Sequence, residues 1–234
     1  MLPLSSQSSE GICGSKAAGA LSRLPQASLK NETSRVADQL DLDDPVAVLL
    51  SVLRALETAG IHASAYGGLA LATYGEARET KDADVAVCGV PGSVGLLALE
   101  KSGLNVTLTF DQMIFGGNLV SRISILGPSD APGLNMADLV EPRSGRYAKD
   151  SLERSGSGNL RGQNLLVLTP EDFVLYKILS TRDRDLEDAA SVVRGLGSQL
   201  DSALIEREVE LLSREIPDHD TTARFRRIQP LLIG

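Results

Sequence analysis

The chain has 234 residues, a formal net charge of −8 and a hydrophobic content of 42%. This length and apolar content allow a sizeable core, so we expect a globular protein with one domain, or one domain and a small helical appendage. The negative charge argues against a broad nucleic-acid-binding surface and leaves room only for a local basic patch. No apolar run approaches the length of a membrane span, and the amino-terminal stretch lacks a basic leader and an apolar h-region. Cys13 and Cys88 favour neither a disulfide framework nor a cysteine metal site, and they fit a reducing cytoplasm.

The first part of the chain predicts a tail followed by a strand–helix–strand unit. Residues 1–42 are rich in Ser, Ala, Gly and scattered charge without a sustained apolar period, so we expect a mobile or loosely packed segment. From residue 43 order is expected: Asp44 caps a helix that begins at Pro45 and ends at Gly60. The patterns that follow predict a strand over 61–66, a short helix over 68–74 and a strand over 82–88.

The rest of the chain predicts further strands and then helices. A helix is expected over 91–103, strands over 105–110, 118–126 and 134–140, and a short strand up to Leu168. Gly156, Gly158 and the neighbouring serines predict a mobile segment, which either closes over a substrate or is plainly disordered. Helices are expected from Pro170, over about Asp185–Arg194 and over 201–216. The predicted fold class is therefore α/β (α+β), with a mixed β-sheet core and flanking helices over 43–168 and a helical region over 169–234.

Two aspartates, Asp82 and Asp84, open the apolar run of the second predicted strand. Because side chains alternate along a strand, both project from the same side and repel each other. A divalent metal ion with oxygen ligands is the usual compensation, and local capping of backbone N–H groups is the alternative. Asp138, on another predicted strand, either offers a third carboxylate or simply ends its strand. Three carboxylates from two strands can hold one or two Mg²⁺.

A glycine pair, Gly67 and Gly68, stands at the preceding strand-to-helix turn. Glycines there let backbone N–H groups approach an oxyanion, and a helix N-terminus favours negative charge. This turn is therefore a candidate phosphate site.

The ordered set of Gly67-Gly68, Asp82-Ala83-Asp84 and Asp138 resembles the nucleotidyltransferase superfamily that includes DNA polymerase β and the aminoglycoside nucleotidyltransferases. More narrowly, "GGLALATYGEARETKDADVAV" with "TPEDFVLYKILSTRDRDLEDA" is similar to bacterial nucleotidyltransferases related to the AbiEii and MenT toxins of toxin–antitoxin systems. The resemblance covers about Tyr66 to Val193. It implies a mixed-sheet nucleotidyltransferase fold and a transfer of a nucleoside monophosphate from an NTP to a hydroxyl, dependent on Mg²⁺ or Mn²⁺, with release of pyrophosphate.

The resemblance assigns roles to matching positions. Gly67 and Gly68 would cradle the triphosphate, and Asp82 and Asp84 would be metal ligands. Asp138 would be the third catalytic and metal-binding carboxylate, which helps to deprotonate the acceptor hydroxyl.

Four further positions match nucleotide-binding positions of the toxin-like branch. Lys177 matches a lysine that faces the phosphates, and Asp185 lies in the charged cluster that follows it. Arg78 and Thr80 lead into the aspartate pair. The alternative for Lys177 is a snorkelling side chain at a helix edge, and most of the charge run over 183–188 is expected to be a solvated helix face.

The sequence leaves several alternatives for the molecule that accepts the nucleotide. Five basic residues between the third carboxylate and the last strand either attract a phosphate-rich acceptor such as tRNA or keep a surface segment soluble; they are Arg143, Arg146, Lys149, Arg154 and Arg161. A small-molecule acceptor of the aminoglycoside type is one rival, and a catalytically silent relative that binds a nucleotide or a partner protein is another. Retention of the three carboxylates favours an enzyme, and an antitoxin protein is the partner expected if the chain is a toxin.

Overall fold

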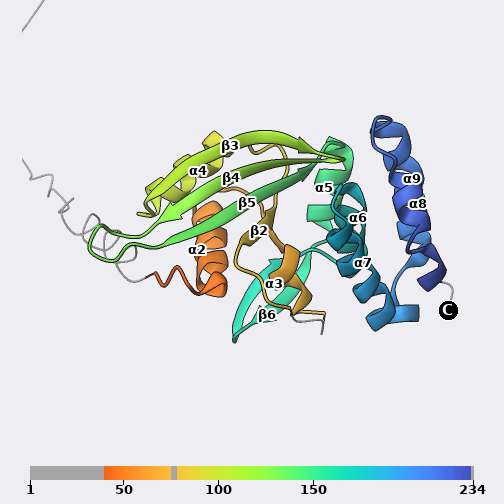
Figure 1. Cartoon of the computed structure of the whole chain (residues 1–234), viewed down its shortest axis with the longest axis horizontal. Coiled ribbons are helices and arrows are strands. Elements are labelled where there is room, and N and C mark those ends of the chain that lie inside the picture. Colours follow the sequence, from red (N-terminus) through yellow and green to blue (C-terminus); the bar gives the residue numbers. More distant parts are fainter. Residues whose placement is uncertain (1–39, 75–77, 233–234) are drawn as a thin grey trace, which may run out of the picture.

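The computed structural model describes residues 40–74 and 78–232, and its strands form one mixed seven-stranded sheet in the order β3-β4-β5-β2-β1-β7-β6 (Figure 1). The strands are β1 Ser64–Tyr66, β2 Ala83–Ala86, β3 Val106–Phe115, β4 Asn118–Leu126, β5 Leu134–Pro142, β6 Gly156–Leu160 and β7 Gln163–Val167. The predicted α/β fold class is confirmed. The predicted tail lies outside the described residues except at its end, where Leu40 and Leu42 pack against the core.

Helices cover one face of the sheet and one of its ends. The α-helices are α2 Pro45–Thr58, α3 Gly67–Leu71, α4 Gly92–Lys101, α5 Gly145–Glu153, α6 Pro170–Leu179, α7 Asp183–Leu196, α8 Ser202–Glu215 and α9 Thr221–Arg226. Two short 3₁₀ helices, η1 Gly197–Gln199 and η2 Gln229–Leu231, complete the described chain. Helices α2 and α4 contact strands β2 to β5 from one side, and α6 to α9 stack at one end of the sheet (Figure 1). No helix within residues 40–74 and 78–232 covers the opposite face of β3 and β4, which Figure 1 turns toward the viewer.

The first helix begins as the sequence predicts. The Asp44 side chain accepts a hydrogen bond from the Val46 N–H at 3.0 Å, and Pro45 occupies the first helical turn. Pro at this position loses no helical hydrogen bond, because the first N–H groups of a helix have no partner within it.

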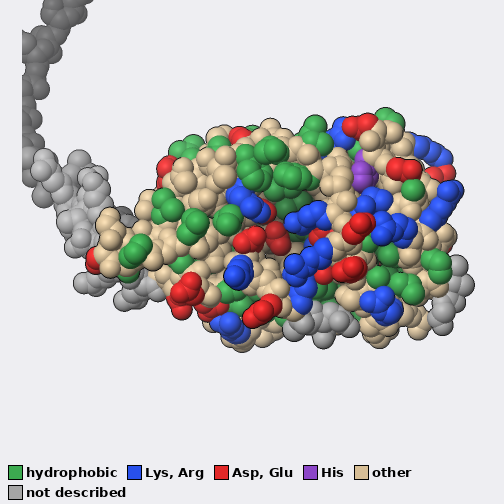
Figure 2. All heavy atoms as spheres, in the orientation of Figure 1, with side chains coloured by type: hydrophobic (Ala, Val, Ile, Leu, Met, Phe, Trp, Pro, Cys, Tyr) green, Lys and Arg blue, Asp and Glu red, His purple; other side chains and the backbone are tan. Residues whose placement is uncertain are grey.

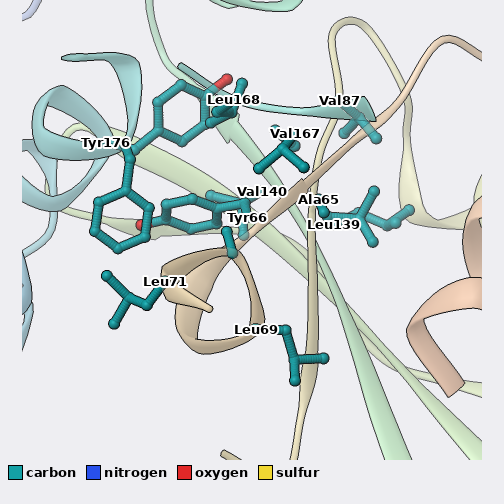
Figure 3. Close-up of a cluster of buried hydrophobic side chains, with 14 of the residues drawn as sticks. Ala65, Tyr66, Leu69, Leu71, Val87, Leu139, Val140, Val167, Leu168 and Tyr176 are labelled. Carbon is teal, nitrogen blue, oxygen red and sulfur yellow. The ribbon is translucent and has the colours of Figure 1, made fainter. Parts of the chain in front are cut away.

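The centre of the sheet and helix α6 share one apolar core (Figure 3). Tyr66 of β1 and Tyr176 of α6 lie with their ring centroids 5.1 Å apart, beside Leu71 of α3. Leu139 of β5 and Val167 of β7 extend the cluster across the sheet. This packing fixes the end of β1, and therefore the glycine turn that follows it, against the helical region.

The prediction of a mobile segment around Gly156 and Gly158 is wrong. These residues lie in β6, which forms an antiparallel hairpin with β7. Arg161 and Gly162 both have positive φ angles, which suits a two-residue hairpin turn. A Cβ atom at Gly158 would lie 2.4 Å from Val167 Cγ2, so this glycine permits close packing within the hairpin.

Other differences from the predicted elements include two shifted boundaries and one helix that was not predicted. Strand β3 continues past Phe110 because two irregularities in its pairing with β4 and a positive φ of 46° at Gln112 keep it in the sheet. Helix α5 was not predicted, although Ser144 caps it by accepting from the Tyr147 N–H. Helix α7 begins at Asp183, two residues before the predicted start, and acidic residues in its first turn suit the helix dipole.

Candidate active site

One row of paired residues crosses five adjacent strands and carries the predicted carboxylates. From β1 to β3 the row is Tyr66, Asp84, Asp138, Arg122 and Phe110. Residues paired across neighbouring strands point to the same face of a sheet, so Asp84 and Asp138 lie side by side. Asp82 reaches the same place, because its Oδ2 atom is 3.8 Å from Arg122 Nη2. The structure therefore brings the three predicted carboxylates together on one face.

Arg122 belongs to this group, and the sequence analysis missed it. Its Nε donates to Asp138 Oδ1 and its Nη2 donates to Asp138 Oδ2, each at 2.7 Å. The guanidinium carbon also lies 5.6 Å from the centroid of the Phe110 ring. The hydrogen bonds to Asp138 raise the pKa of Arg122, so the guanidinium stays charged. A lone arginine within the apolar strand "NLVSRISIL" was the available signal, but its partner follows only from the register of β4 with β5.

Asp84 is the carboxylate that lacks a partner. It is partly buried, and no group in the described parts of the chain donates a hydrogen bond to it. Burial raises its pKa to about 7; Lys177 opposes the shift, while Asp138 and Asp82 add to it. A group in this state is stabilised in its ionised form by a cation, so Asp84 and the nearby Asp82 fit a divalent metal ion.

A ready set of three metal ligands is nevertheless not formed. Among the residues that the structure describes, no group of three His, Cys, Asp or Glu side chains is arranged to hold a metal ion. Asp138 has both oxygens bound by Arg122. Asp82 and Asp84 therefore remain the best oxygen ligands for a metal ion at this site.

The glycine pair is required by packing against the site. Gly67 has a φ of +71°, and a Cβ atom there would lie 1.8 Å from Asp84 Oδ2. A Cβ atom at Gly68 would lie 2.8 Å from Thr80 Cβ. Asp84 and Thr80 therefore account for the two glycines by steric fit. The predicted contact of this turn with phosphates stays a prediction.

Lys177 lies in a buried ion-pair network rather than at a helix edge. Only 2% of its side chain is exposed, and its Nζ lies 2.7 Å from Asp185 Oδ1 and 3.1 Å from Asp188 Oδ2. The ammonium also sits over the rings of Tyr66 and Phe173, at 5.1 and 5.4 Å from their centroids. The snorkelling alternative is wrong, since the charge is paired inside the protein.

Asp185 connects this network to the surface. Burial raises its pKa, but the hydrogen bonds and charges of Lys177, Ser180 and Arg182 outweigh that effect and bring the pKa to about 2. Arg182 donates from Nε to Asp185 Oδ2 at 2.7 Å, while 72% of its side chain stays exposed. Arg182 is thus a solvent-facing cation, and its charge is close enough to Asp84 to lower the pKa of that carboxyl. Sequence reasoning missed it because it stands in a charge run.

Asp188 was expected to lie on a solvated helix face, and this expectation is wrong. Its side chain is buried and pairs with Lys177 and with Arg78, whose Nη2 lies 3.0 Å from Asp188 Oδ2. Arg78 was predicted to bind nucleotide, but its guanidinium is engaged by this carboxylate and by the Glu79 carbonyl. Helical periodicity alone does not separate Asp188 from its exposed neighbour Glu187.

The surface around the site is recessed and mixed in charge (Figure 2). Acidic side chains gather in the middle of the face shown, basic side chains flank them, and hydrophobic side chains lie over the sheet above. A pocket of about 530 Å³ lies elsewhere, between α2 and the β6–β7 hairpin. It is lined mainly by apolar side chains such as Leu50, Leu53 and Leu165 and contains none of the predicted site residues.

No protein-family model and no curated protein matches this sequence. Solved structures do resemble it, among them the crystal structure of an antigenic nucleotidyltransferase-like protein from Paracoccidioides brasiliensis. That chain is 17% identical, and the match covers 84% of this chain and 93% of the other at a TM-score of 0.43. The likeness is too distant to assign a function to this chain.

The five basic residues that were candidates for an RNA-binding patch are each engaged by carboxylates. Ion pairs join Arg143 to Asp218, Arg146 to Asp150, Glu208 and Glu215, Lys149 to Glu153, Arg154 to Asp172, and Arg161 to Asp44. Their charges therefore offer little net attraction to a polyanion, and the alternative that they serve the surface of the protein is favoured. None of the helices over residues 40–74 and 78–232 is long and apolar enough to cross a membrane.

Proposed function

We propose that this protein is a metal-dependent nucleotidyltransferase that moves a nucleoside monophosphate from an NTP to a hydroxyl and releases pyrophosphate. One observation carries the proposal: Asp84, without a hydrogen-bond donor in the described residues, lies beside Asp82 and Asp138 on one face of the sheet. A carboxylate that lacks a donor beside two further carboxylates favours a cation, and a cation held there would attract a triphosphate.

Asp82 and Asp84 would hold Mg²⁺ or Mn²⁺. The bound ion would polarise the reacting phosphoryl group and neutralise its charge. The protein's own part is positioning: the fixed row of β2 and β5 places the carboxylates, and the Gly67 turn lies directly against Asp84. Asp138, held by Arg122, would orient the acceptor hydroxyl.

The phosphates would meet the exposed cation Arg182, since Lys177 is buried in ion pairs. The Nε and Nη2 of Arg182 already donate to Asp185, so Nη1 and the remaining N–H of Nη2 would be the donors that meet the phosphates. Lys177 and Asp185 would not contact the nucleotide. Their ion pair would join α6 to α7, and Asp185 would hold Arg182 in position. The glycine turn and Thr80 would complete the triphosphate site.

The proposed acceptor group is a hydroxyl, and the molecule that carries it is a separate proposal. A tRNA acceptor and a role as the toxin of a toxin–antitoxin pair follow from the sequence resemblance to the toxin-like branch. An aminoglycoside-type small molecule is the alternative acceptor.

Activity is tested by incubating the protein with each α-labelled NTP, Mg²⁺ or Mn²⁺, and total RNA, protein extract or aminoglycosides. Transfer of label to any acceptor is expected, and Asp84→Ala should abolish it because the metal site loses a ligand. Asp130→Ala, at an exposed loop, is the matched control and should retain transfer. Absence of transfer by the wild-type protein with every nucleotide and acceptor would reject the enzymatic proposal.

A second candidate is a catalytically silent relative that binds a nucleotide. The two hydrogen bonds from Arg122 to Asp138 favour it, because they engage the carboxylate that would assist the acceptor. Calorimetric binding of NTP and metal without any transfer would support this candidate over the enzyme.

A further inference from the structure

Arg122 neutralises part of the carboxylate site from within the sheet. Its two 2.7 Å hydrogen bonds engage both oxygens of Asp138, and its Nη2 lies 3.8 Å from Asp82 Oδ2. Arg122 therefore places a positive charge between Asp138 and Asp82, which is the charge that a second metal ion would supply in a site with two ions.

The guanidinium is also fixed in place. Arg122 lies between Asp138 of β5 and Phe110 of β3 in the paired row, with its side chain only 27% exposed. Paired, charge-assisted hydrogen bonds of a guanidinium to a carboxylate are among the stronger polar contacts in proteins. A metal ion bound to Asp138 would share each carboxylate oxygen with an Arg122 N–H and would stand directly beside the guanidinium charge, which repels it.

Asp82 and Asp84 are engaged differently. Asp84 has no hydrogen-bond donor within the described residues, and Asp82 has an exposed side chain at a distance of 3.8 Å from Arg122, beyond hydrogen-bond range. These two carboxylates stay accessible to a cation while Asp138 does not.

We propose that Arg122 takes the place of a second metal ion, so that the protein binds one divalent cation per chain through Asp82 and Asp84. This inference rests on the metal dependence in the proposed function. It adds the number of metal ions bound per chain and names Arg122 as the residue that determines that number. Arg122 is here a positioning residue that holds Asp138, and it contributes its positive charge to the site.

The test is titration of the full-length protein with Mn²⁺ alone, followed by calorimetry and by the electron paramagnetic resonance signal of free Mn²⁺. Wild type is expected to bind one Mn²⁺ and Arg122→Met two, because Asp138 is then released. Arg161→Met, which removes an arginine paired with Asp44 at the β6–β7 turn, is the matched control and should still bind one. Two Mn²⁺ in wild type, or one in a folded Arg122→Met protein, would overturn the inference.

Asp138→Asn keeps the test decisive if Arg122→Met does not fold. Asparagine retains an acceptor for Arg122, so this variant should bind one Mn²⁺ with a Kd within about threefold of wild type. A larger loss of affinity would identify Asp138 as a direct ligand and reject the inference. The proposed function fails separately: a wild type that binds one Mn²⁺ and transfers no nucleotide rejects the enzyme, whereas unchanged stoichiometry in Arg122→Met rejects only the role of Arg122.

Discussion

Replacing Asp84 by asparagine should stabilise the metal-free protein, and more so as the pH rises. Burial raises the pKa of Asp84 from 3.8 to about 7, and Asp138 and Asp82 add to the rise. The folded state therefore binds this proton more tightly than the unfolded state does. Protonated Asp84 stabilises the folded state in full below about pH 4, and this stabilisation is lost as the pH rises to about 7.

The size of the effect follows from linkage. Between the two pKa values the folded protein loses about 1.4 kcal/mol per pH unit, and above pH 7 the loss levels off. From pH 5.5 to pH 8.5 the loss therefore reaches about 2 kcal/mol as an upper value. Because Asp84 keeps some contact with water, we expect Asp84→Asn to gain about 1–2 kcal/mol over wild type across this interval.

The measurement is urea denaturation of both proteins at pH 5.5 and pH 8.5 in a chelator. Asp82→Asn is the control, since its side chain is 39% exposed and its substitution should change the free energy of unfolding by less than about 0.5 kcal/mol. Added Mn²⁺ should stabilise wild type and leave Asp84→Asn nearly unchanged, because ligand binding stabilises only the protein that binds it. An advantage for Asp84→Asn that is equal at both pH values would refute the argument, since it would not come from ionisation.

Three further predictions concern the surroundings of this carboxylate. Lys177→Met should lower the free energy of unfolding by about 3 kcal/mol in urea denaturation, because it leaves buried carboxylates without their ammonium partner. The control Lys149→Met, at an exposed ion pair, should lower it by less than about 0.5 kcal/mol. Gly67→Ala should cost more than about 2 kcal/mol by the same measurement, since its Cβ collides with Asp84; Gly60→Ala, with a similar positive φ and no atom near its Cβ, should cost about 1 kcal/mol. Arg182→Gln should weaken NTP binding about tenfold or more in calorimetry while the protein stays folded, and an unchanged Kd would show that Arg182 does not meet the phosphates.

The sequence predicted the parts of the fold that depend on local chemistry. The cap at Asp44 and the placement of Asp82 and Asp84 on one face follow from residue type and from the period of a strand. The proximity of Asp138 was predicted from its place on another strand of the same sheet and from a family resemblance, and the parallel register of β2 with β5 accounts for it.

Other features depend on pairing between distant segments, which no local pattern encodes. Arg122 faces Asp138 only because β4 and β5 pair in one register, and a shift of one residue would turn its side chain to the opposite face. Gly158 looks like a loop residue by composition, yet it lies in a strand because the chain packs closely at Val167. Asp188 of α7 is buried because it forms an ion pair with Lys177 of the preceding helix, α6.

The buried network also determines how an activity loss in Lys177 variants must be interpreted. Its ammonium lies over the Tyr66 ring, and Tyr66 is both the register partner of Asp84 and the residue before Gly67. Removing the ammonium therefore disturbs the strand that carries the glycine turn, so lost transfer alone does not identify a phosphate contact. A direct contact requires that NTP affinity fall more than stability explains under conditions where the variant is fully folded. The structure favours the opposite result, because the exposed guanidinium of Arg182 lies between this network and solvent. In that arrangement an Arg182 variant loses nucleotide affinity with little loss of stability, and a Lys177 variant loses stability first.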